Sequence, residues 1–147
     1  MNDLIKIVIL IGFSGVKFAM AFPYAFALSL SFIEIFFYTS LGGVLGVIFF
    51  SNFSEFIINT WVKLFPQKKK KRVITKKNKL VVKTWKKYGL PGIALLTPIL
   101  LSIPIGTFIV VRYKEPKKRI YLFMTVAVVF WSLVLSTLTN LFEIAVF

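Results

Sequence analysis

The chain has 147 residues, of which 58% are hydrophobic, and a formal net charge of +14 from 19 Lys and Arg against 5 acids. It contains no cysteine and no histidine, which excludes disulfides, thiolate metal sites and the usual general base. The acids are not spaced as an acid–base pair or a metal cluster; they are Asp3, Glu34, Glu55, Glu115 and Glu143. We therefore expect no catalytic residue, no metal, no cofactor and no enzymatic activity.

Apolar runs long enough to cross a bilayer indicate a membrane protein. The run from Leu90 to Val111 has no charge, and the run from Tyr121 to Phe147 has only Glu143. About 20 apolar residues span a hydrocarbon core, and a soluble domain of this size would expose too much such surface. The sequence predicts a single all-α, multi-pass domain over residues 1–147, located in a cell (inner) membrane.

The first apolar segment, residues 4–30, is interrupted by Pro23. Proline lacks the amide hydrogen and clashes with the preceding helical turn, so we predict a break near residues 21–24. Ala19-Met20-Ala21 has the small-x-small pattern of a signal-peptide cleavage site. Because Lys17 lies beside it, we expect the segment to be retained instead.

A second apolar run, residues 32–50, is predicted to span the membrane. Within it, Gly42 and Gly46 form a Gly-x-x-x-Gly face for close helix packing, inside the fold or between copies. Asn52, with an acid three residues later, has the pattern of a helix N-cap. We therefore predict a new amphipathic helix over residues 53–65.

Two basic clusters follow, and they predict the topology. The first comprises Lys68, Lys69, Lys70, Lys71 and Arg72, and the second comprises Arg112, Lys114, Lys117, Lys118 and Arg119. Apolar residues recur at helical spacing after the first cluster, which predicts a basic surface helix. Short basic loops stay cytoplasmic, so we expect both clusters inside, near anionic lipids, and both termini outside. Nucleic acid is not expected, because the loop lacks interleaved aromatic residues.

Only the segment 90–111 separates the two clusters, and a straight span would put them on opposite sides. We predict a re-entrant hairpin, bent by its prolines and covered by neighbouring helices. The first half has the same plan, which indicates an inverted repeat. Repeat one covers residues 1–65, a basic loop and amphipathic helix covers 66–88, and repeat two covers 89–147.

Four short stretches carry a family resemblance: Lys17-Phe18-Ala19-Met20-Ala21-Phe22-Pro23, Ser31-Phe32-Ile33-Glu34, Lys87-Tyr88-Gly89-Leu90-Pro91-Gly92 and Pro104-Ile105-Gly106-Thr107. With them the chain resembles the small multidrug export protein family and, more distantly, the DedA (VTT-domain) membrane proteins. The resemblance implies paired re-entrant hairpins; DedA-type proteins are thought to move lipid carriers with proton coupling. Lys17 and Ala19 stand where the export family has an acid and an arginine, so the charged groups for proton coupling are not matched.

A lysine inside an apolar segment is costly without an anion, and amides freed by proline attract anions. We therefore predict a substrate site from Lys17, Pro23, Ser102, Pro104, Gly106 and Thr107. In the alternative interpretation, Lys17 extends to the membrane interface.

Two functions stay open. One is a transporter-like or lipid-flippase-like protein that handles an anionic or amphipathic substrate where two hairpins meet. The other is a non-catalytic accessory subunit that packs within a larger membrane protein complex. The expected protein partner is thus either another copy of the chain or such a complex.

Overall fold

The computed structural model of the chain describes residues 2–64 and 76–146, apart from the side chains of Trp61, Val62, Lys77 and Asn78. Within these ranges every regular element is helical, which confirms the all-α class. The helices are α1 (Asp3–Val16), α2 (Phe18–Ala27), α3 (Phe32–Leu64), α4 (Lys76–Leu96), the π-helical turn η1 (Thr97–Leu101), α5 (Ile103–Arg112) and α6 (Lys117–Val146).

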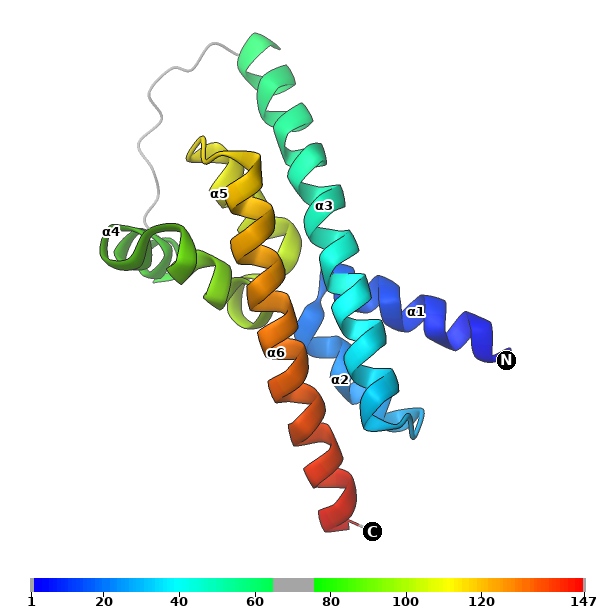
Figure 1. The fold of residues 1–147 in the computed structure, drawn as a ribbon. Coiled ribbons are helices and arrows are strands. Elements are labelled where there is room, and N and C mark those ends of the chain that lie inside the picture. The colour runs from blue at the N-terminus through cyan, green and yellow to red at the C-terminus, as the bar shows by residue number, and fades with distance from the viewer. Residues whose placement is uncertain (1, 65–75, 147) are drawn as a thin grey trace.

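The two longest helices, α3 and α6, run antiparallel through the centre of the fold (Figure 1). The Thr39 hydroxyl donates to Ser132 at 3.4 Å, and the Tyr121 hydroxyl donates to Asn52 at 3.3 Å. The parts Phe32–Thr60 and Lys117–Val146, of 29 and 30 residues, are long and apolar enough to cross a membrane. At about 1.5 Å per residue, each exceeds the hydrocarbon core of about 30 Å.

Large apolar side chains cover the outside of this helix pair. Phe37 and Phe49 of α3, and Leu122 of α6, are each more than 60% exposed. The buried positions include small hydroxyl residues, namely Thr39, Ser51, Ser54, Ser132, Ser136 and Thr139. Small and hydroxyl residues inside with large apolar residues outside are typical of helices packed in lipid.

Glycines bring α1 close to α3. A Cβ built on Gly15 lies 3.1 Å from the Gly42 carbonyl oxygen and 3.6 Å from the Gly46 Cα. A Cβ on Gly42 would overlap the Ser14 hydroxyl. The Gly-x-x-x-Gly face of α3 therefore contacts a helix of the same chain.

The predicted helix start after Asn52 is wrong, because α3 continues without a break from Phe32 to Leu64. The Asn52 side chain does not cap a helix. Its amide donates to the Ile48 carbonyl one turn earlier at 2.9 Å, and its oxygen accepts from Lys117 and Tyr121 of α6. The Asn52 side-chain oxygen, which would accept from a backbone amide in a helix cap, therefore contacts α6 instead.

The predicted break at residues 21–24 is also wrong, because Pro23 lies inside α2. Proline has a backbone φ compatible with a helix and removes one hydrogen bond, so it can bend a helix without ending it. The chain instead breaks at Lys17, whose φ of −121° and ψ of 77° are not helical.

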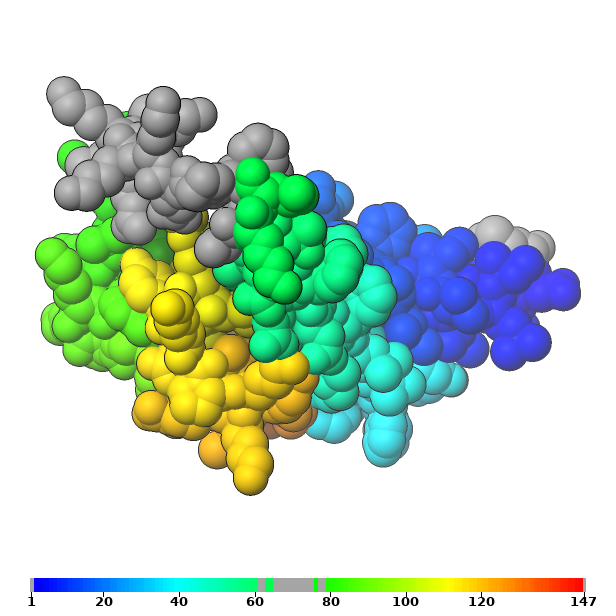
Figure 2. Space-filling model, turned by 90° about the horizontal axis from the view of Figure 1, so that it is seen from above, coloured from blue at the N-terminus to red at the C-terminus, as the bar shows by residue number. Residues whose placement is uncertain are grey.

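Helices α1 and α4 extend to opposite sides of the central helices, and the view from above agrees (Figures 1 and 2). Helix α4 lies crosswise to α3 and α6 and bends at Gly89, which has φ 64° and ψ −145°. The basic part before this bend is held by Trp85, which stacks on Tyr113 with ring centroids 4.1 Å apart.

Candidate functional site

Two interruptions of the helical backbone define the candidate site, and the first is at Lys17 between α1 and α2. The Lys17 amide donates to the Phe13 carbonyl at 2.7 Å, which closes α1. The Lys17 carbonyl accepts from Met20 at 2.9 Å, which starts α2. The Lys17 side chain is exposed and makes no ion pair or hydrogen bond among the described residues.

The second interruption is at Ser102, between the π-helical turn η1 and α5. Its φ of 67° and ψ of 151° lie in a region that is occupied almost only by glycine and costs about 1–3 kcal/mol for other residues. The Ser102 carbonyl accepts from Gly106 at 3.0 Å, which starts α5. Gly106 packs directly on the Thr97 side chain, so η1 and the first turn of α5 are held together.

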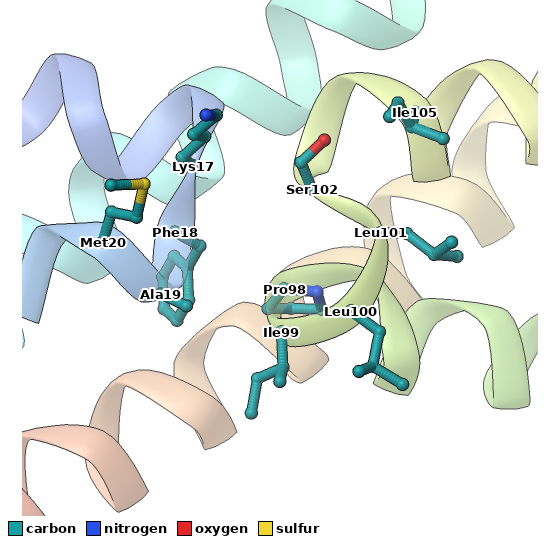
Figure 3. Close-up of a pocket in the computed structure, with 10 residues that line it drawn as sticks. All are labelled: Lys17, Phe18, Ala19, Met20, Pro98, Ile99, Leu100, Leu101, Ser102 and Ile105. Atoms are coloured by element: carbon teal, nitrogen blue, oxygen red, sulfur yellow. The ribbon is translucent and has the colours of Figure 1, made fainter. Parts of the chain in front are cut away.

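The two interruptions meet in one pocket of about 280 Å³, called here the break pocket (Figure 3). Its walls face each other and are formed by two stretches, Lys17, Phe18, Ala19 and Met20 on one side and Pro98, Ile99, Leu100, Leu101, Ser102 and Ile105 on the other. Lys17 and Ser102 lie along one edge in this view, whereas the remaining lining is apolar. Because Lys17, Met20, Leu100 and Ile105 are exposed, the pocket opens to the outside of the chain.

Of the six predicted substrate residues, the structure places only Lys17 and Ser102 on this pocket. Pro23 is exposed on α2, and Pro104 is half-buried in the first turn of α5. Gly106 and Thr107 are buried, and the Thr107 hydroxyl donates to the Ile103 carbonyl at 2.8 Å. The Thr107 hydroxyl is therefore used within its own helix.

The apolar lining residues of the break pocket were not among the predicted site residues. Those on the first wall directly follow Lys17, and those on the second wall directly flank Ser102. The positive φ of Ser102, which positions the second wall, has no signal in the residue type. A glycine there would have indicated a turn, whereas serine does not.

The acidic residues are mostly engaged elsewhere. Asp3 pairs with Lys6 at 3.1 Å, Glu55 with Lys117, and Glu115 with Arg119 at 3.4 Å. Glu34 accepts from the amide and hydroxyl of Ser31, both at 2.9 Å. Glu143 is half-buried on α6 and forms no ion pair within the described part of the chain. Within the described residues, no acidic side chain therefore neutralises the Lys17 ammonium group.

The predicted lipid-facing cations are only partly described. Residues 68–72 lie outside the described ranges. Arg112, Lys117, Lys118 and Arg119 are exposed, and two of these pair with the acids named above. The described residues contain no group of His, Asp or Glu that could hold a metal ion.

No protein-family model, curated protein or solved structure matches the chain. The resemblance to the small multidrug export and DedA proteins therefore stays a prediction. Across residues 2–64 and 76–146 the fold is helical, with two helices of membrane-spanning length and an open pocket where two helix breaks meet.

Proposed function

We propose that the chain is a multi-pass membrane protein that binds an anionic amphipathic molecule in the break pocket and moves it across the membrane. The proposal rests on the composition of the break pocket. It combines one unpaired ammonium group and one hydroxyl with apolar walls, and it opens outward. An ammonium and a hydroxyl suit an anionic head group, and the apolar walls suit an acyl chain.

The energetics of Lys17 support a ligand. A charged side chain placed within an apolar membrane segment costs a few kcal/mol unless an anion, oriented dipoles or water offset it. No acidic residue in the described part of the chain pairs with Lys17. A bound anionic ligand would therefore offset the free-energy cost of placing this charge in the membrane. The backbone strain at Ser102, on the opposite wall, is also typical of ligand sites.

We further propose that α1–α2 and the stretch from Gly89 through η1 to α5 are two re-entrant hairpins of an inverted repeat. Each broken segment precedes a long helix, α3 or α6, and these two helices are antiparallel. The Trp85–Tyr113 stack and the Glu55–Lys117 pair bring basic groups of α4, α5 and α6 together at one end of α3. We assign this end to the cytoplasmic side, with both termini outside, because short basic loops stay inside.

Lipid transfer in proteoliposomes tests the proposal. The wild-type protein should move a fluorescent phosphatidylglycerol between leaflets faster than protein-free vesicles do. Lys17→Ala should reduce this rate at least about tenfold, because the head group loses its only cationic partner. Lys17→Arg keeps the charge and should retain transfer. Lys6→Ala, in α1 and away from the pocket, is the matched control. Equal rates for wild type and Lys17→Ala would contradict the proposed site.

A second candidate, an accessory subunit of a membrane complex, is favoured by the first turns of α1. This end projects away from the central helices (Figure 1), and its Leu4 and Val8 side chains are 75% and 66% exposed. No residue before Leu10 is buried among those described. A partner helix would cover this apolar end.

The two candidates give opposite results with paired variants. In an accessory subunit, Leu4→Ser with Val8→Ser should release a co-purifying partner, while Lys17→Ala has no effect. In a transporter, only Lys17→Ala should abolish transfer. Bulky changes at Gly42 or Gly46 do not separate the candidates, because α1 already covers that face.

A further inference from the structure

The basic part of α4, before the bend at Gly89, carries five of its six lysines on one face. At about 100° per residue, these five side chains fall within an arc of about 100°. They are exposed and form what we call the cationic face, namely Lys76, Lys79, Lys83, Lys86 and Lys87. The opposite side of the helix carries buried Val81 and half-buried Trp85.

Contacts with α5 fix the direction of the cationic face. Trp85 stacks on Tyr113 with an angle of 13° between the ring planes. Since Trp85 points toward the body of the protein, the lysines point away from it. Tyr113 also stands between Arg112 and Lys114, which are both exposed. The stack therefore brings the turn after α5, with two more cations, next to α4.

Within the described part of the chain, the lysines of the cationic face form no ion pair. No acid occurs between Glu55 and Glu115 in the sequence. Lysines three and four residues apart on one helix face repel one another and weaken the helix. A surface rich in anions would reverse that effect, because each lysine would then be attracted to it.

We propose that the cationic face, with Arg112 and Lys114, is a binding surface for the phosphate groups of an anionic lipid bilayer. Three features favour a bilayer over a nucleic acid. Helix α4 lies crosswise to the helices of membrane-spanning length (Figure 1). Exposed Leu80 and Val82 flank the lysines, and a stacked Trp–Tyr pair is typical of the lipid head-group level. This inference rests on the proposed membrane location but not on the break pocket.

Amide hydrogen exchange of residues 79–88 in nanodiscs tests this surface. Phosphatidylglycerol in place of phosphatidylcholine should slow exchange about tenfold, because the anionic surface stabilises the helix. The Lys79/Lys83/Lys86→Gln variant should lose this dependence on lipid charge. Lys6/Lys17/Lys63→Gln removes the same charge outside the cationic face and outside both basic clusters, and should retain it.

Three results would overturn the proposal. Exchange could be equal in the two lipids, or single-stranded RNA or inorganic phosphate added to phosphatidylcholine nanodiscs could protect the helix as well as phosphatidylglycerol does. The lipid dependence could also persist in the α4 variant. A protein that does not enter bilayers contradicts the membrane location and hence both proposals. A protein that enters and shows no dependence on lipid charge contradicts this one alone.

Discussion

Gly15 of α1 packs backbone to backbone against Gly46 of α3. A Cβ built on Gly46 would lie 2.5 Å from the Gly15 carbonyl oxygen and 2.7 Å from its Cα. Both distances are shorter than a carbon atom tolerates, and the obstructing atoms are backbone, which cannot move aside without separating the helices. The position of α1, and with it the Lys17 wall of the break pocket, therefore depends on the missing side chain.

Gly46→Ala should destabilise the protein by about 1–3 kcal/mol, because the added methyl separates α1 from α3. The measurement is the thermal unfolding midpoint in a mild detergent. Gly12→Ala is the matched control on α1, since a Cβ at Gly12 meets no atom within 4 Å. The control should be neutral or slightly stabilising, because alanine favours a helix. A Gly46→Ala protein as stable as Gly12→Ala would contradict the close packing of these helices.

The Trp131 indole of α6 holds the end of α4 in place. Its Nε1–H donates to the Leu95 carbonyl at 2.8 Å, just before the η1 turn that forms the second wall of the pocket. Trp131→Phe retains most of the ring but removes the donor, and should cost about 1 kcal/mol. Phe130→Leu, at the exposed neighbouring position, is the control. If the two variants unfold at the same temperature, this hydrogen bond is not a significant tie between α4 and α6.

Glu55 and Lys117 pair between α3 and α6 at the basic end of the fold. Lys117→Glu should lower the unfolding temperature slightly, because two carboxylates would then face each other. Adding Glu55→Lys should restore it with the charges exchanged. The effect should shrink as salt rises, since both side chains are about half-exposed. Lys118→Glu makes the same charge change beside the pair and should show no rescue by Glu55→Lys. Rescue of both variants would indicate a general charge effect, not a pair.

The apolar runs 32–50 and 121–147 predicted two spanning helices, and their described residues lie within α3 and α6. The run 90–111 is just as apolar but is interrupted at Ser102. Short local patterns were less reliable than these long runs, because the helix start predicted after Asn52 and the break predicted near Pro23 are both wrong. Asn52 has a cap pattern, yet its side chain bonds to α6. The residues that break the chain, Lys17 and Ser102, are neither proline nor glycine. Their conformations depend on packing between distant segments, which the local sequence does not contain. The two polar residues of the break pocket could therefore be predicted from the sequence, whereas its apolar walls could not.

The strain at Ser102 gives the last prediction. Ser102→Gly should stabilise the protein by about 1 kcal/mol, since relief of the unfavourable φ and ψ exceeds the greater flexibility that glycine adds to the unfolded chain. Ser102→Val should destabilise it, because a β-branched residue is least compatible with a φ of 67°. Ser29→Gly is the control, as Ser29 also has a positive φ, 51°, but lies after the end of α2 and away from the pocket.

Thermal unfolding of the three variants measures the effect on stability, and lipid transfer measures its consequence for the pocket. If the strained turn holds Ser102 toward the head group, the more stable Ser102→Gly protein should transfer lipid more slowly than Ser29→Gly. A Ser102→Gly protein less stable than wild type would mean that the serine side chain stabilises the turn, and that the backbone there is not strained.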